Sequence, residues 1–110
     1  MKSIAYNDKT DSVIVDEHVS RKILAYGNDL MAVEVHFKQG GVGAPHTHSH
    51  AQISYIVSGK FEFTTKERKH IVGPGDSLYF ESGASHGAVC LQEGTILDIF
   101  TPFRSDFLSQ

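Results

Sequence analysis

The sequence between residues 43 and 52 reads Gly43-Ala44-Pro45-His46-Thr47-His48-Ser49-His50-Ala51-Gln52. Three histidines occupy alternate positions in it, and Gln52 continues the alternation. Alternate side chains of a β-strand lie on one face, so an extended strand here would bring the imidazoles and the amide together. Neutral imidazole is the commonest side-chain ligand of metal ions in proteins. The stretch therefore predicts a metal site.

A further ligand is expected from a distant part of the chain, because one strand cannot surround an ion. His86 is the candidate, since it opens a strand-like stretch after a loop that contains Gly83. The other three histidines, His18, His36 and His70, are expected to be structural or solvated.

Length and composition describe one domain over residues 1–110, with 40% apolar and 21% charged residues, typical of a soluble globular protein. The formal charge of −3 gives no basic footprint for nucleic acid or for an anionic membrane. The first residues lack the apolar core of a signal peptide, and the single Cys90 cannot form an intrachain disulfide. We therefore expect a cytoplasmic protein.

Short alternating or apolar stretches recur along the chain and are separated by turn signals such as Ser58-Gly59 and Glu93-Gly94. Residues 1–12 are expected to form an arm or an edge segment, and the tail after Thr101 a turn or short helix. No long amphipathic helix is indicated. This pattern predicts an all-β sandwich or barrel. The expected strands are 30–37, 53–57, 60–65, 67–72, 77–80, 86–91 and 95–100.

Large apolar residues occupy both faces of two of these strands. On residues 52–57, for example, Ile56 falls on one face and Ile53, Tyr55 and Val57 on the other. Both faces therefore need cover. Either the N-terminal segments supply it, or a second copy of the chain does. The homodimer is the favoured alternative.

The spacing of these residues resembles the two sequence motifs of the cupins, small double-stranded β-helix or jelly-roll barrels. The two motifs cover residues 40–90. The first motif, G-x5-H-x-H-x3,4-E-x6-G, falls on Gly40, His46, His48, Gln52 and Gly59, with Gln52 in the usual Glu position. The second, G-x5-P-x-G-x2-H-x3-N, falls on Gly75, Glu81, Gly83, His86 and Cys90, with Glu81 and Cys90 in the Pro and Asn positions.

This resemblance implies a cupin fold and one divalent transition metal ion (Zn, Ni, Mn or Fe) held by His46, His48, Gln52 and His86. The neutral amide of Gln52 leaves the full charge on the ion, which favours Lewis-acid chemistry on an anionic substrate over iron oxygenase chemistry. His50, beside the ligands, is expected to contact substrate or to support the site.

The tail from Leu97 to Leu108 carries Asp98 and Phe100 on one strand face and Arg104 beyond it. Together with the histidine run it resembles the KdgF-type cupins, the pectin degradation proteins, over roughly residues 31–108. That resemblance implies conversion of 4,5-unsaturated uronates, the products of pectate and alginate lyases, to linear 5-keto-4-deoxyuronate. Asp98 would transfer the proton, Phe100 would position the sugar ring, and Arg104 would bind the substrate carboxylate.

Two other classes of function stay open at this point. One is a different metal-dependent cupin enzyme, an oxygenase or lyase acting on a small organic acid. The other is a non-enzymatic cupin that binds a metabolite. All three share a small acid or sugar as the partner, with no nucleic acid and no membrane.

Overall fold

The structure is a computed structural model that describes residues 1–46, 49–66 and 68–109, without the side chains of 44–46 and 109. The described residues contain two short 3-10 segments and no α-helix. The strands are β1 (Val13–Ile14), β2 (Val19–Tyr26), β3 (Met31–Phe37), β4 (Val42–His46), β5 (Ala51–Thr65), β6 (Lys69–Val72), β7 (Ser77–Phe80) and β8 (His86–Thr101); the 3-10 segments are η1 (Asn7–Lys9) and η2 (Ser105–Ser109).

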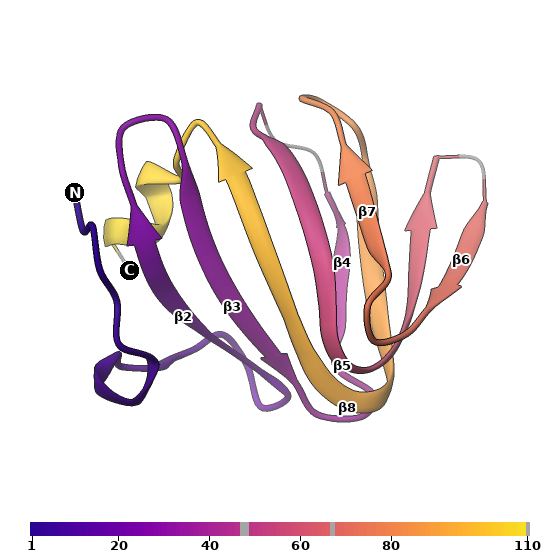
Figure 1. Ribbon diagram of the computed structural model, residues 1–110. Coiled ribbons are helices and arrows are strands. Elements are labelled where there is room, and N and C mark those ends of the chain that lie inside the picture. The colour runs from indigo at the N-terminus through magenta and orange to yellow at the C-terminus, as the bar shows by residue number, and fades with distance from the viewer. Residues whose placement is uncertain (47–48, 67, 110) are drawn as a thin grey trace.

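All strands join one antiparallel sheet in the order β1-β2-β3-β8-β5-β6, with β4 pairing to β8 and β7 pairing to β5. Figure 1 shows the long strands β5 and β8 turning at the bottom of the view, so that the sheet folds over and its two halves face each other. The predicted all-β barrel fold is confirmed. No helix in the described part of the chain is long and apolar enough to cross a membrane.

The turns predicted at Ser58-Gly59 and Glu93-Gly94 are wrong. Both pairs lie inside continuous strands, and the β5–β8 register shifts between Ile56 and Phe61. A glycine inside a strand marks a bulge or a close backbone approach as readily as a turn. Here the two glycine positions meet, and the long strands bend at that point. The predicted strand at 67–72 begins at Lys69, and Glu67 lies outside the described residues.

The close approach explains why both strands need glycine at the bend. A Cβ on Gly59 would stand 2.6 Å from the Gly94 Cα, and one on Gly94 would stand 2.5 Å from the Gly59 Cα. Any side chain at either position would therefore push the strands apart. The described glycines with positive φ are the four motif glycines: Gly40, Gly59, Gly75 and Gly83. Their φ values of 82–88° lie in the left-handed region that favours glycine.

The interior side of the sheet follows the predicted alternation. On β3, Met31 and Val33 are fully buried and Phe37 is 6% exposed. On β5, Ser54 and Ile56 are buried on the face that Gln52 shares. The aromatic part of the core lies between the two halves of the sheet and is formed by Phe37, Phe61, Phe63 and Phe80.

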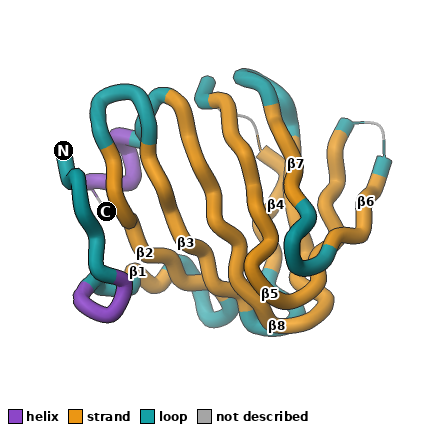
Figure 2. The backbone as a smooth tube through the Cα atoms, in the orientation of Figure 1, coloured by secondary structure: helices purple, strands orange, loops and turns teal. Residues whose placement is uncertain are grey.

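The outer face of β5 is apolar and open to solvent. Ile53, Tyr55 and Val57 are 47%, 45% and 50% exposed. The N-terminal segment instead pairs with β2 through Lys2 and Tyr26, and Figure 2 shows it running along the β2 edge. The alternative in which the N-terminal segment covers this face is therefore wrong for β5. The homodimer stays a prediction.

Candidate active site

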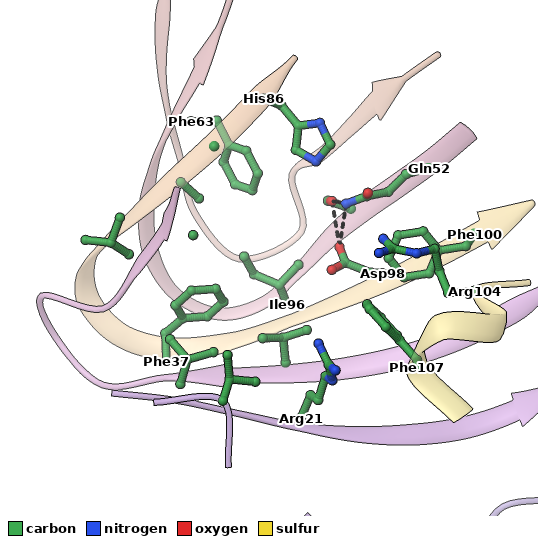
Figure 3. A pocket seen from close by; sticks show the side chains of 18 residues that line it. Arg21, Phe37, Gln52, Phe63, His86, Ile96, Asp98, Phe100, Arg104 and Phe107 are labelled. Atoms are coloured by element: carbon green, nitrogen blue, oxygen red, sulfur yellow. Dashed lines mark hydrogen bonds between the residues drawn. The ribbon is translucent and has the colours of Figure 1, made fainter. Parts of the chain in front are cut away.

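A cavity of about 340 Å³ lies between the two halves of the sheet, a volume within the usual range for small-molecule sites. One end is lined by apolar side chains such as Phe37, Phe63 and Ile96. The other end is polar, and Figure 3 shows its side chains directed into the same space. The polar end and its rim are formed by Arg21, Gln52, Ser54, His86, Asp98, Phe100, Arg104 and Phe107.

Pairing between β5 and β8 places the central residues of the site. Gln52 lies opposite Phe100, and Ser54 lies opposite Asp98. Directly opposed residues in an antiparallel pair direct their side chains to the same face of the sheet. The buried face of the two strands therefore carries Gln52, Ser54 and Asp98. Regular strand pairing, and not a loop, holds these side chains in the cavity.

The histidine run does not form the single extended strand that its alternation predicts. β4 ends at His46, residues 49 and 50 form a bend, and β5 begins at Ala51. Residues 46 and 52 therefore belong to two different strands, β4 and β5, which both pair with β8. The predictions for His48 and for the side chain of His46 lie outside the described residues. The backbone of His46 lies directly opposite His86 of β8, which is the distant partner expected from the sequence.

Gln52, Ser54 and Asp98 form a buried hydrogen-bonded group. The Gln52 Nε2 donates to the Ser54 Oγ at 2.8 Å and to the Asp98 Oδ1 at 3.2 Å. The Ser54 Oγ donates to the same Asp98 oxygen at 2.6 Å. Gln52 is 6% and Ser54 1% exposed, so these bonds form away from bulk water, where they orient the carboxylate strongly.

The same bonds allow a test of whether Gln52 suits a metal ion. A carboxylate only accepts hydrogen bonds, so the Gln52 NH₂ must face Asp98 and its Oε1 is the atom able to coordinate a cation. His86 is 4% exposed, and Figure 3 shows its ring directed toward Gln52. Among the residues whose side chains the structure describes, no group of three or more His, Cys, Asp or Glu is arranged to hold a metal. The side chains of His46 and His48, two of the expected ligands, are not among the described ones. The two expected ligands that are described fit such an ion.

Aromatic stacking orients His86. Its ring lies parallel to Phe80 with centroids 4.1 Å apart and an interplanar angle of 13°. Phe80 stacks in turn on Phe63, at 5.9 Å and 24°. This stack restricts the rotation of the imidazole. As a metal ligand, His86 would therefore already be oriented before the ion binds.

Arg104 is engaged by a carboxylate of the protein itself. Its Nε and Nη2 donate to the two oxygens of Asp106 at 3.0 and 2.7 Å. The hydrogen bonds from Arg104 hold the pKa of the Asp106 carboxyl below its usual value. The guanidinium also lies over Phe100 at 5.3 Å and over Phe107 at 4.3 Å. Arg104 therefore lies at the rim as expected, but one edge of its guanidinium is already paired.

His50 lies next to Phe100, with the two rings edge to face and their centroids 6.5 Å apart. Phe100 is 3% exposed and meets Phe107 in the same manner at 5.7 Å. His50 thus contacts the aromatic wall of the cavity.

Sequence reasoning missed Ser54 and Arg21 as members of the site. Ser54 falls on the same predicted strand face as Gln52 and Ile56. A hydroxyl on that face, next to an expected metal ligand, was the available signal. For Arg21 the signal was a charge two residues from both Val19 and Ile23, on the apolar face of a strand.

These features define a class of protein. A jelly-roll sheet with the two motif regions at one cavity is the arrangement of the cupins. The sequence model of the cupin-domain family matches residues 33–100 of this chain. The chain belongs to the cupin family.

Particular relatives are similar over different shares of their length. The pectin degradation protein KdgF of Dickeya dadantii is 39% identical over 98% of this chain and 100% of its own. The solved structure of KdgF from Halomonas sp. superposes with a TM-score of 0.92 at 41% identity, covering 96% of this chain and 99% of the other. The oxalate decarboxylase OxdC of Bacillus subtilis is 31% identical over 69% of this chain but only 21% of its own.

Proposed function

We propose that the protein acts in pectin degradation by converting 4,5-unsaturated uronates to linear 5-keto-4-deoxyuronate. The observation that carries the proposal is the Asp98 carboxylate, oriented by Ser54 and Gln52 inside a cavity of about 340 Å³. Similarity to KdgF over almost the whole chain supports the same reading. Similarity to oxalate decarboxylase would favour a decarboxylating enzyme instead, but it covers only about a fifth of that protein.

One divalent transition metal ion belongs to this proposal, with His46, His48, Gln52 and His86 as its ligands. Such an ion would supply Lewis-acid polarisation of substrate oxygens. The opposed backbone positions of His46 and His86 and the orientation of the Gln52 amide support this ligand set.

The proposed reaction is an isomerisation, so one proton must move and nothing is added or lost. The C1 hydroxyl of the cyclic sugar gives up its proton, the bond between C1 and the ring oxygen breaks, and C1 becomes an aldehyde. The ring oxygen stays on C5 as an enolate, and delivery of that same proton to C4 turns the enolate into the ketone. A single carboxylate can take this proton from the C1 hydroxyl and return it to C4, and the hydrogen bond from Ser54 supports Asp98 in this role.

The aromatic and cationic side chains of the rim would hold the sugar during this transfer. Phe100 offers a buried wall against which the apolar face of a pyranose ring can lie. Arg104 would bind polar oxygens of the substrate through the donors that Asp106 does not occupy. The stacked guanidinium and phenyl groups form one rigid rim, which reduces the cost of orienting the sugar.

A metal-dependent loss of ultraviolet absorbance is the expected result when the protein meets unsaturated galacturonate made with a pectate lyase. The loss should be at least about 100-fold faster than the spontaneous rate, since acid–base catalysis alone contributes that much. Protein treated with a chelator should be inactive and should recover with one of Zn²⁺, Ni²⁺, Mn²⁺ or Fe²⁺. Proton NMR would follow the loss of the alkene proton at C4.

Three results would contradict the proposal and favour the other classes of function. If absorbance were lost only at the spontaneous rate with metal bound, the result would favour a metabolite-binding cupin without enzymatic activity. Consumption of oxygen would indicate an oxygenase, and release of CO₂ from a small acid would indicate a decarboxylating lyase.

We also propose that a second copy of the chain covers the outer face of β5. The exposed Ile53, Tyr55 and Val57 lie in one row, and Tyr79 of β7, opposite Ile53, is 67% exposed. Light scattering should give the mass of a dimer, and Tyr55→Glu should give a monomer because it places a charge in the apolar row. Lys60→Glu, a charge change further along the same strand, is the control and should stay dimeric. A monomeric wild-type protein would contradict the proposal.

A further inference from the structure

Asp106 of η2 holds the guanidinium of Arg104 from outside the cavity. Its two carboxylate oxygens accept from Nε and Nη2 of Arg104, the side-on edge of the guanidinium, at 3.0 and 2.7 Å. Among the described residues, Arg104 lines the cavity and Asp106 does not. A guanidinium has a second edge, formed by its two Nη atoms, that can also bind a carboxylate through two parallel hydrogen bonds. Because Asp106 takes the side-on edge, the end-on edge is the one that a ligand in the cavity would meet.

Asp106 also offsets a repulsion between two cations at the rim. Arg21 of β2 lies over the Phe107 ring with its Cζ 3.9 Å from the ring centroid, and Arg104 lies over the same ring at 4.3 Å. Figure 3 shows Phe107 between the two arginines. Burial and then the charge of Arg104 lower the pKa of Arg21, and the charge of Asp106 raises it. Removing the charge of Asp106 would therefore weaken what keeps Arg104 beside this ring.

The exposure of the ion pair distinguishes positioning from a role in the fold. The side chain of Asp106 is 58% exposed and that of Arg104 is 14% exposed. An ion pair with an exposed member contributes little to the stability of a fold. Its bidentate geometry instead fixes the direction of a guanidinium that also lies over Phe100 and Phe107. A substitution of Asp106 should therefore change the direction of Arg104 and leave the protein folded.

We propose that Asp106 is a positioning residue that keeps Arg104 directed at the carboxylate of an acidic sugar in the cavity. This inference rests on the proposed function, because it takes the cavity as the sugar site and Arg104 as its cation. It predicts the opposite of what charge alone would do. Removing a negative charge beside the rim would by itself strengthen the binding of an anion, whereas loss of positioning weakens it. The sign of the change therefore decides between the two effects.

The kinetic test is Asp106→Asn assayed with unsaturated galacturonate. Asparagine keeps the shape of the side chain but presents an NH₂ group in place of one accepting oxygen, so one of the two hydrogen bonds is lost. KM should rise by about 5- to 20-fold, because a misdirected guanidinium binds the carboxylate less well. The kcat should change by less than about threefold, since only binding is affected. Asp106→Glu keeps both accepting oxygens and should recover part of the loss. Asp8→Asn makes the same change on the exposed η1 segment and should leave KM unchanged.

A double-mutant cycle tests whether Asp106 acts through Arg104. Arg104→Gln alone should raise KM by about 10- to 100-fold, the effect of losing a charge-assisted hydrogen bond. Adding Asp106→Asn to Arg104→Gln should then raise KM no further. An unchanged or lower KM in Asp106→Asn would overturn the inference with the proposed function intact. So would an Asp106→Asn effect of equal size with and without the arginine.

Calorimetry on the metal-loaded protein separates this inference from the proposed function. Wild type should bind galacturonate more tightly than galactose, and Asp106→Asn should lose part of that preference while galactose binding is unaltered. Equal weakening of both sugars, or no preference for the acid in wild type, would overturn the inference. If wild type preferred the acid but failed to turn over the unsaturated sugar, the proposed function would fail. The same cycle, measured as dissociation constants for galacturonate, would then still decide the role of Asp106.

Discussion

Replacing Asp98 with asparagine is expected to lower turnover of the unsaturated uronate by about 10² to 10⁴, the usual contribution of a positioned acid–base group. Asp98 is the one carboxylate among the described residues that line the cavity. Asparagine has the same shape, and its oxygen can still accept the hydrogen bond from Ser54. The substitution therefore removes the ability to carry a proton while the geometry is kept. Absorbance loss under saturating substrate would measure the effect.

Metal content and folding should be unchanged in the Asp98→Asn protein, which mass spectrometry of the metal and circular dichroism would check. Ser54→Ala is the matched comparison. It removes the 2.6 Å hydrogen bond that orients the carboxylate but leaves the proton carrier, so turnover should fall by only about tenfold. If Asp98→Asn retained more than about a tenth of the wild-type rate with its metal bound, another group would have to move the proton.

Local alternation predicted which side chains face the interior. The period of two on Met31, Val33 and Phe37, and on Gln52 and Ile56, follows from the geometry of any strand with one buried face. No partner strand need be known for such a prediction. The same local information was enough for the all-β fold, because the chain lacks a long helical pattern.

The two false turns show where local information fails. A glycine can mark a turn or a bulge, and the sequence around Gly59 or Gly94 is compatible with both. The difference lies in the other strand. Each glycine is needed because the other backbone passes within 2.6 Å of where its side chain would stand. That contact joins positions 35 residues apart in the chain, and no pattern around either one contains it.

The site divides in the same way. His86, Asp98 and Phe100 could be found from motif spacing and strand alternation. Alternation places Ser54 on the same face as Gln52, but its role depends on a hydrogen bond to a residue 44 positions away. Arg21 depends on β2 lying beside the cavity and on Phe107 of η2 returning to meet it. Residues that act through tertiary contacts carry little signal of their own.

Replacing Gln52 with glutamate, the usual residue of the cupin motif, is expected to change metal binding and activity in opposite directions. The new carboxylate should bind a divalent ion at least as tightly, because it adds a negative charge to the ligand set. Turnover should fall by about 10- to 100-fold, because the donor that holds Asp98 is lost. The Gln52 Nε2 now lies 3.2 Å from the Asp98 Oδ1, and a carboxylate oxygen in its place would repel that oxygen.

Metal titration of the chelator-treated protein and the absorbance assay, run side by side, would separate the two effects. Gln52→Ala is the control, because it removes both the coordinating oxygen and the donor, so metal affinity and turnover should fall together. A Gln52→Glu protein with wild-type turnover would show that Asp98 does not need the amide. The hydrogen bond between the proposed metal ligand and the proposed proton carrier would then be a packing feature, without a part in the reaction.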